Sequence, residues 1–206
     1  MEKSIIDNHA VNDYPIHDLL RKRWSARAFS TRKVEKTKLF SILEAARWTP
    51  SSRNEQPWRY IVFTSNNPSK LSEAQSVLLE SNSFAKQAPI LICAITKKTY
   101  TGSQDPNRLY FHDLGAANEN MFLESFNQGL IMHEMGGFNV ALAREVFKIP
   151  DDYEVGIMIA IGYQGTSDSL PEKLKIQNTK PRERKPLSQI AYLEDLDHGL
   201  EVKTNE

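Results

Sequence analysis

The sequence predicts an α+β or α/β protein, with a central sheet flanked by helices as the favoured arrangement. Three short runs are rich in β-branched, aromatic and apolar residues, as strands are: 58–64, 89–97 and 153–163. The segments between them carry apolar residues at the three- and four-residue spacing of helices. Because both kinds of segment are mixed through all 206 residues without an internal repeat, we expect one layered domain with a sizeable core.

Helical spacing predicts five helices, at 15–23, 35–48, 68–80, 107–128 and 138–147. The fourth is the longest, and Gly129 follows it at a position where a glycine commonly ends a helix. Pro150 lies shortly after the fifth and prevents its continuation. The predicted strand 89–97 is almost entirely apolar, and so is the stretch from Gly156 to Gly162, so both are expected to be buried.

Charge and composition exclude several classes of protein. Lys and Arg number 26, Asp and Glu also number 26, and this zero net charge argues against a general nucleic-acid binder. No apolar run approaches the roughly 20 residues of a membrane span. The first residues lack the apolar core of a signal peptide. We therefore expect a cytoplasmic protein without a membrane or nucleic-acid partner.

Several common site motifs are missing. The single cysteine, Cys93, allows neither an intramolecular disulfide nor a cysteine-based zinc site, and its apolar neighbours predict a small buried side chain. His133 and Glu134 begin like a zinc-protease motif, but Gly137 stands where the second histidine is required. No metal site is predicted. The glycine-rich dinucleotide motif, the phosphate loop and the α/β-hydrolase nucleophile motif are also absent.

Two basic clusters, at 21–27 and 180–186, are candidates for binding one dianion. Arginine suits this task because its planar guanidinium donates two parallel hydrogen bonds to a phosphate. The alternative interpretation is two solvated basic turns, each paired with nearby acids.

Two further segments have the groups needed to recognise a flat polar ring. Between Pro50 and Pro57 lie four compact hydrogen-bonding residues: Ser51, Ser52, Asn54 and Gln56. The segment 132–139 carries Gly136 and Gly137 before a predicted helix, where paired glycines let the backbone approach a ligand and present N–H groups. In isolation, each segment also fits an ordinary turn.

Taken together in this order, the elements resemble the FMN-dependent nitroreductase family. The family's N-terminal basic motif corresponds to Arg23-Trp24-Ser25-Ala26-Arg27, although Trp24 replaces its second basic residue. The other matching elements are Pro50-Ser51-Ser52-Arg53-Asn54-Glu55-Gln56-Pro57-Trp58, Gly137-Phe138, Ala160-Ile161-Gly162-Tyr163 and Arg182-Glu183-Arg184-Lys185-Pro186-Leu187. The resemblance covers residues 15–192, which leaves an N-terminal arm, 1–14, and a C-terminal tail, 193–206.

The resemblance implies an α+β sandwich, with a mostly antiparallel sheet flanked by helices, and an intertwined homodimer that binds FMN at the subunit interface. Arg23 and Ser25 are expected to hold the FMN phosphate from one side, and Arg182 and Arg184 from the other. Arg27 is expected beside N1 and O2 of the flavin ring, where its charge favours the reduced form.

The resemblance also assigns the groups around the ring. Ser51, Ser52 and Asn54 are expected to reach it from the other subunit, in a loop that Pro50 and Gln56 complete. The backbone at Met135, Gly136 and Gly137 is expected to approach N5. Trp24 and His133 are the remaining candidate cofactor-binding residues. No catalytic side chain is expected, because the flavin itself carries the hydride chemistry.

The implied activity is hydride transfer from NADH or NADPH, through N5 of FMN, to a nitroaromatic, quinone or similar small acceptor by a ping-pong cycle. Three alternatives stay open. One is a relative that reductively dehalogenates a substrate or consumes the flavin, for which only 98–112 offers a short lid. The others are a non-catalytic FMN-binding protein and a structural protein with a decayed site.

Overall fold

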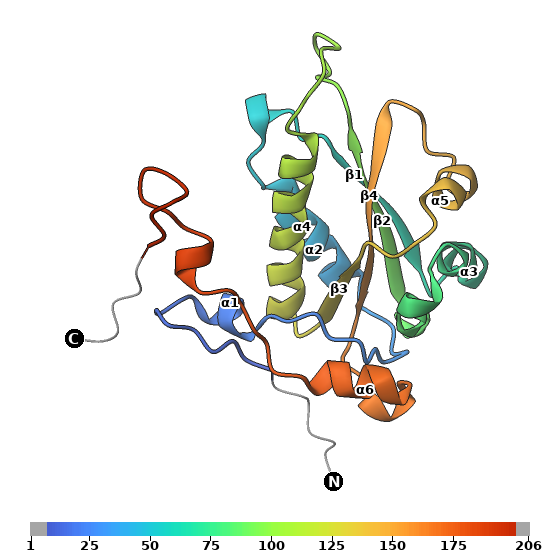
Figure 1. Ribbon diagram of the computed structural model, residues 1–206. Coiled ribbons are helices and arrows are strands. Elements are labelled where there is room, and N and C mark those ends of the chain that lie inside the picture. The colour runs from blue at the N-terminus through green and yellow to red at the C-terminus, as the bar shows by residue number, and fades with distance from the viewer. Residues whose placement is uncertain (1–7, 201–206) are drawn as a thin grey trace.

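The computed structural model describes residues 8–200, and these contain a four-stranded sheet whose neighbouring strands are all antiparallel. The strands lie in the order β1 (Trp58–Thr64), β2 (Ile90–Lys97), β4 (Tyr153–Gly162) and β3 (Ile131–Met135). One face is covered by α2 (Lys36–Arg47) and α4 (Tyr110–Asn127), and the other by α3 (Pro68–Ser76) and α5 (Val140–Val146) (Figure 1). The α+β prediction is confirmed.

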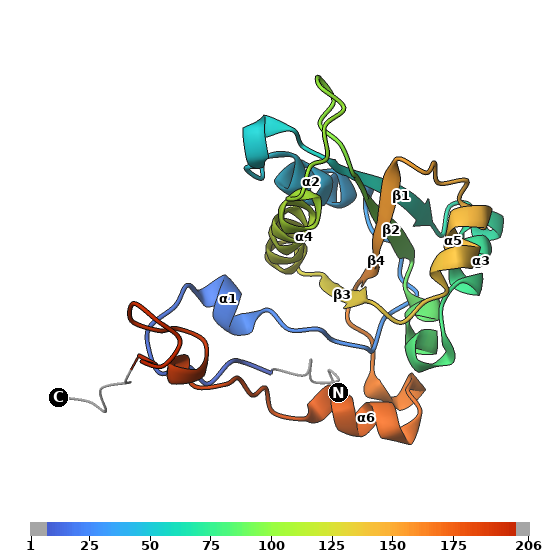
Figure 2. The same ribbon diagram turned by 45° about the horizontal axis from the view of Figure 1, so that its top comes forward.

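Figure 2 shows the same three layers from a second direction, with α2 and α4 on one side of the sheet and α3 and α5 on the other. Two helices lie outside these layers: α1 (Asp18–Lys22) and α6 (Glu172–Thr179). Short 3-10 helices span Ser52–Asn54, Glu80–Gln87, Ser167–Ser169 and Leu187–Gln189. Gly129 follows α4 with a positive φ of 74°, as predicted for a residue that ends a helix.

Strand β2 packs against apolar side chains on both of its faces. Alternate residues turn to opposite sides of a strand. Ile90, Ile92 and Ala94 therefore join the cluster beneath α2 and α4, whereas Leu91, Cys93 and Ile95 join the cluster beneath α3 and α5. All six are at most 5% exposed. This two-sided burial explains the continuous apolar run in the sequence, and it confirms the prediction of a small buried side chain at Cys93.

Strand β4 contains a bulge at Gly156. The pairing with β2 shifts between Ala94 and Ile95, whose partners are Ile157 and Val155, so Gly156 is the extra residue. A Cβ atom at this position would lie 2.5 Å from a side-chain carbon of Leu114 on α4. The absence of a side chain thus allows α4 to pack closely against the sheet.

The elements that are not predicted from the sequence include β3, α6 and the four 3-10 helices, of which Glu80–Gln87 is the longest. Strand β3 has five residues, and four of them are buried, so it shows no alternation; its pairing with β4 defines it instead. Helix α6 carries few apolar residues, so its helical spacing is weak. The predicted helices are longer than the observed ones; 15–23, for example, contains only Asp18–Lys22.

Residues 8–14, α1 and residues 181–200 extend away from the sheet and run beside each other (Figures 1 and 2). Asn8 Nδ2 donates to the Lys180 carbonyl at 3.0 Å, and the Ala10 N–H donates to the Arg21 carbonyl at 2.8 Å. The predicted boundaries, an arm at 1–14 and a tail at 193–206, fall partly outside the described residues.

The segments 11–16 and 190–196 expose several large apolar side chains: Val11, Tyr14, Ile16, Ile190, Leu193 and Leu196. An extended pair of segments with this much apolar surface does not bury it within the described chain. Between residues 8 and 200, no helix combines the length and the hydropathy that crossing a membrane requires.

Candidate functional site

Arginines from the two predicted basic clusters meet in the structure. Arg23 follows α1, whereas Arg182 and Arg184 lie more than 150 residues later, yet all three line one cavity of about 610 Å³. The remaining wall comes mostly from the segments 10–20 and 185–190: Ala10, Val11, Asn12, Asp13, Tyr14, Ile16, Leu20, Lys185, Pro186, Leu187 and Ile190, with Glu119 from α4. The cavity is therefore basic on one side and largely apolar elsewhere.

The positive charge of this cavity exceeds its negative charge. Arg23 Nε lies 3.6 Å from a carboxylate oxygen of Glu119, and its guanidinium lies 4.5 Å from the ring centre of Phe122. Arg182 donates to the Arg21 carbonyl at 2.9 Å. Burial lowers the pKa of Arg182, and the charges of Arg23 and Arg184 lower it further. Guanidinium groups held together in this way attract an anion.

Between Trp24 and Arg27 the side chains alternate between the core and the surface, although the Ala26 N–H donates to the Trp24 carbonyl at 3.1 Å in a tight turn. Trp24 and Ala26 are buried in the cluster beneath α3 and α5, whereas Ser25 and Arg27 are half-buried. The Trp24 indole is 6% exposed, which places it among core side chains. A contact between Trp24 and a cofactor stays a prediction.

Arg27 is held in place through its backbone. Its N–H donates to Asn178 Oδ1 at 2.8 Å, and Asn178 Nδ2 donates to Ser167 Oγ at 3.1 Å. The Arg27 guanidinium lies 5.9 Å from the ring centre of Phe84, and burial lowers its pKa. Among residues 8–200 no carboxylate forms an ion pair with it, so a half-buried positive charge is left for a ligand.

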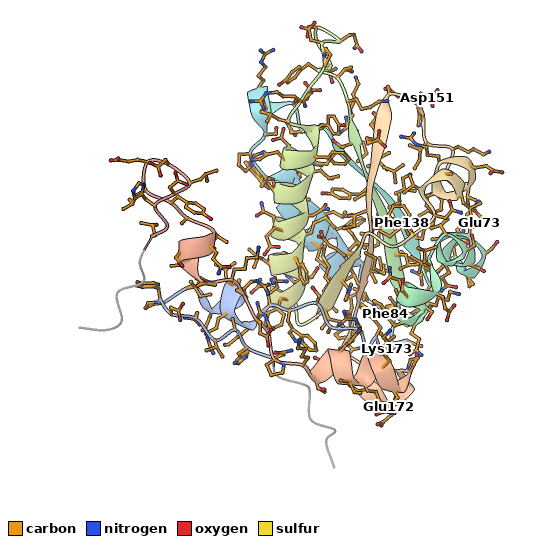
Figure 3. All side chains as sticks on the ribbon, in the orientation of Figure 1. Glu73, Phe84, Phe138, Asp151, Glu172 and Lys173 are labelled. Carbon is orange, nitrogen blue, oxygen red and sulfur yellow. The ribbon has the colours of Figure 1, made fainter. Side chains whose placement is uncertain are left out.

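His133 connects β3 to the arginine motif. Its Nδ1 donates to the Ala26 carbonyl at 3.0 Å, and Phe84 packs edge-on against its ring at 4.9 Å. Burial lowers the pKa of His133 to about 4, which keeps the ring neutral. Phe84 and Phe138 lie on the same side of the sheet as α3 and α5 (Figure 3). His133 thus supports Arg27 from beneath, whereas Met135 is buried in the core.

The two adjacent glycines after β3 differ in their surroundings. A Cβ atom at Gly137 would lie 2.8 Å from Asn82 Nδ2, which donates to the Gly137 carbonyl at 2.8 Å. A Cβ atom at Gly136 would meet no other atom within 4 Å. The Gly136 backbone is therefore accessible, as a close approach to a ligand requires.

The loop from Pro50 to Gln56 has an unusual backbone. Arg53, Asn54 and Gln56 have φ values of 55°, 56° and 50°, a region that residues other than glycine seldom occupy. Ser51 Oγ accepts a hydrogen bond from the Gln56 N–H at 2.9 Å, and Gln56 Nε2 donates to Asn54 Oδ1 at 3.1 Å. These bonds close the loop on itself.

The structure does not bring this loop to the arginines. Ser52 contacts Asp113 in the first turn of α4, whereas Arg23 packs on Phe122 later in the same helix. At 1.5 Å per residue, Asp113 and Phe122 are about 13 Å apart along the helix axis. Within one chain, the predicted residues therefore form two separate groups, one around the arginines and β3 and one in the loop.

A buried carboxyl beside Arg23 was not predicted from the sequence. Glu134 on β3 turns to the opposite face from His133, toward α4, where Asn118 donates to it. Tyr60 donates to Asn118 Oδ1 at 3.0 Å. Glu134 Oε1 is buried without a hydrogen-bond partner among the described residues. Burial raises the pKa of Glu134, and the charge of Glu119 raises it further.

Comparison with known proteins identifies the family. The model of the nitroreductase family matches residues 20–81. A protein of Archaeoglobus fulgidus, proposed as an NADH dehydrogenase/NAD(P)H nitroreductase, is 30% identical over 152 residues, which is 70% of this chain and 83% of the relative. This chain belongs to the nitroreductase family.

Solved structures agree with this nitroreductase-family membership. An oxidoreductase containing FMN has a TM-score of 0.85 and 31% identity, with 95% of this chain and 98% of the other covered. An FMN-dependent nitroreductase from Clostridium difficile R20291 has a TM-score of 0.59 and 28% identity, with 75% and 93% covered.

Four residues that contact the candidate site residues were not predicted from the sequence: Asn82, Asp113, Glu134 and Asn178. Each is a polar residue buried or half-buried in an otherwise ordinary segment. The hydrogen bond between Asn178 and Arg27 joins residues 151 positions apart, so no local sequence pattern predicts it. Asn82 likewise bonds to Gly137 across 55 positions.

The neutral ring of His133 predicts a stability that decreases in acid. Below its ordinary pKa of 6.5 the unfolded histidine is protonated, whereas the folded one stays neutral down to about pH 4. Unfolding free energy should therefore fall by about 3 kcal/mol between these pH values. In His133→Gln this contribution should disappear. Urea unfolding of the apoprotein measures it, with His198→Gln, at an exposed histidine, as the control; identical slopes in all three proteins would contradict it.

The buried carboxyl of Glu134 predicts the opposite trend. Because its folded pKa is raised, the unfolded chain loses the proton first, and stability falls as pH rises above the ordinary value of 4.5. Glu134→Gln should remove this slope and raise the unfolding free energy at neutral pH by about 1 kcal/mol. Glu172→Gln, at an exposed carboxyl on α6 that is labelled in Figure 3, is the control. If Glu134→Gln had a lower unfolding free energy than the wild type at neutral pH, the carboxylate would stabilise the fold and the prediction would be wrong.

Proposed function

We propose that this protein is an FMN-dependent oxidoreductase that uses NADH or NADPH to reduce a nitroaromatic, quinone or similar small acceptor. The observation that carries the proposal is the convergence of Arg23, Arg182 and Arg184 on one cavity, with Glu119 as the one described carboxylate paired to them. This charge fits the dianionic phosphate of FMN. The names of the relatives support the choice of ligands, since they include FMN and NAD(P)H.

In this proposal the phosphate is held by charge from both ends of the chain. Arg23 and Ser25 bind it from the N-terminal arginine motif, and Arg182 and Arg184 bind it from the segment after α6. Arg182 is already oriented by the Arg21 carbonyl, so its remaining N–H groups are directed without further loss of freedom. Each charge-assisted hydrogen bond contributes about 1.5–3 kcal/mol.

The groups proposed for the flavin ring are Arg27 and the backbone of Met135, Gly136 and Gly137. When bound, FMN supplies a ring that accepts hydride from NAD(P)H and passes it to the acceptor. Arg27 stabilises the negative charge that reduction leaves on the pyrimidine edge, because its own charge is half-buried and unpaired. Gly136 keeps its backbone accessible to the ring. His133 holds the Ala26 carbonyl and so orients Arg27.

We further propose that the site is completed by a second copy of this chain. The loop with Ser51, Ser52 and Asn54 lies at the other end of α4 from Arg23, so one chain does not bring both to one ligand. The exposed apolar side chains of the segments 11–16 and 190–196 supply surface for an intertwined homodimer. An interface cleft also leaves one face of the ring open to NAD(P)H and then to the acceptor.

The first test is an absorption spectrum of the purified protein, after FMN addition and desalting, followed by NADH and NADPH oxidation with an acceptor panel. Arg184→Ala should weaken FMN binding about 10- to 100-fold, through loss of one charge-assisted bond. Fluorescence titration measures this affinity. Lys173→Ala, at an exposed cation on α6 (Figure 3), is the control and should bind normally.

Three results would contradict parts of the proposal. Equal FMN affinity in Arg184→Ala and the wild type would remove Arg184 from the phosphate site. A protein that retains no flavin after reconstitution would overturn the oxidoreductase assignment, and a flavin-loaded protein without NAD(P)H oxidation would favour a binding protein.

Sharing of the site between subunits predicts complementation. Arg184→Ala and Ser52→Ala damage opposite halves of one site, so each homodimer should bind FMN weakly. After denaturation and refolding together, mixed dimers should contain one intact site each, which restores about a quarter of the wild-type sites. Flavin retained after desalting measures them. No gain on mixing, or a flavin-loaded monomer in gel filtration, would place the complete site within one chain.

A further inference from the structure

The loop from Pro50 to Gln56 is braced by a neighbouring protrusion. Residues 98–107 project from the sheet between β2 and α4, and both views show them beside the 3-10 helix Ser52–Asn54 (Figures 1 and 2). The loop has three residues with positive φ, a conformation that costs free energy and persists only where surrounding contacts hold it. The contacts that hold it here come from two elements.

The first contact comes from beneath the loop. Asp113 is 2% exposed, and its Oδ2 accepts a hydrogen bond from the Ser52 N–H at 3.1 Å. Its other oxygen, Oδ1, accepts from His112 Nδ1 at 3.1 Å. Asp113 lies in the first turn of α4, where the helix dipole stabilises a negative charge. The Asp113 carboxylate therefore fixes the backbone of Ser52.

The second contact comes from the side. The Tyr100 hydroxyl lies 3.1 Å from Ser52 Oγ, and the Arg53 guanidinium lies 4.7 Å from the centre of the Tyr100 ring. The protrusion is itself ordered by a turn, since the Tyr100 N–H donates to the Asp105 carbonyl at 2.9 Å. Next to it, the Thr101 N–H donates to Glu55 Oε1 at 2.9 Å. The protrusion therefore contacts the 3-10 helix Ser52–Asn54 at both of its ends, through Tyr100 and Thr101.

We infer that Asp113 and Tyr100 are positioning residues that hold Ser52 and its loop in the flavin-binding conformation before the ligand arrives. The inference rests on the proposed function, because it assigns a purpose to contacts of the loop that we place against the flavin ring. Pre-organisation strengthens binding, since the entropy of ordering the loop is lost on folding and not on association. It also gives residues 98–107 a role other than that of a lid.

The contacts determine which groups of Ser52 remain for a ligand. Its N–H is occupied by Asp113, so the hydroxyl is the remaining donor. When the Tyr100 hydroxyl donates to Ser52 Oγ, the Ser52 hydroxyl hydrogen is free to bond to an acceptor on the ring. Removal of the Tyr100 hydroxyl should therefore act only through Ser52.

The experiment compares Tyr100→Phe, Ser52→Ala and the double variant in FMN fluorescence titrations, with urea unfolding of each apoprotein. Tyr100→Phe should weaken FMN binding about 3- to 10-fold, the loss of one neutral hydrogen bond, with an unchanged unfolding midpoint. The double variant should bind no more weakly than Ser52→Ala alone, because both changes act on one contact. Tyr110→Phe, at a hydroxyl without a hydrogen bond among the described residues, is the control and should bind like the wild type.

Asp113 is tested by a conservative pair. Asp113→Ala should weaken FMN binding about 10-fold or more by releasing Ser52, whereas Asp113→Asn keeps an acceptor oxygen and should restore much of the affinity. If Asp113→Ala does not fold, the FMN affinities of Tyr100→Phe and of the double variant test the inference without it.

Three outcomes separate this inference from the proposed function. Weak binding in Ser52→Ala with wild-type affinity in Tyr100→Phe would overturn the positioning role and leave the flavin site intact. Additive losses in the double variant would overturn it as well. Wild-type affinity in both Ser52→Ala and Arg184→Ala would instead overturn the proposed site itself.

Discussion

The two-sided burial of β2 is the constraint on which the rest of the structure depends. A strand whose residues are apolar on both faces requires a layer of helices on each side. The layer with α4 presents Glu119 and Phe122 to Arg23, and it presents Asp113 to Ser52. The opposite layer, with Phe84, supports Arg27 and His133. Both groups of candidate ligand-binding residues therefore have fixed positions because the core between them is fixed.

Charge decides what the arginine cavity can bind. Three guanidinium groups within one wall repel each other, and folding tolerates this because Glu119 offsets part of the charge and water reaches the rest. The cavity therefore has a positive electrostatic potential, which favours the binding of an anion. Glu134 lies behind Arg23, and burial together with the charge of Glu119 raises the pKa of its carboxyl, so this site opposes a second negative charge beside the arginines. The charge balance around Arg23 thus depends on Glu134 in the layer beneath, as well as on the residues that line the cavity.

Polar side chains from distant segments supply the geometry of the site. Asn178 fixes the backbone of Arg27, Asn82 fixes Gly137, and His133 fixes the carbonyl of Ala26. Each makes a buried or half-buried hydrogen bond whose loss would leave an unpaired polar group, so each tolerates little movement. Rigid support of this kind is what a binding site needs when the cofactor itself performs the chemistry.

The sequence by itself determined the layered α+β class, the burial of β2, the end of α4 at Gly129 and the motifs that resemble a family. These are local properties, because spacing, composition and capping act over a few residues. Tertiary structure decided that Arg23 meets Arg182 and Arg184, that Trp24 enters the core, and that Asp113 holds Ser52. It also decided β3, a strand defined by its partner β4 rather than by its own five residues. Contacts across 50 to 150 positions depend on packing of the whole core, and no local pattern records them.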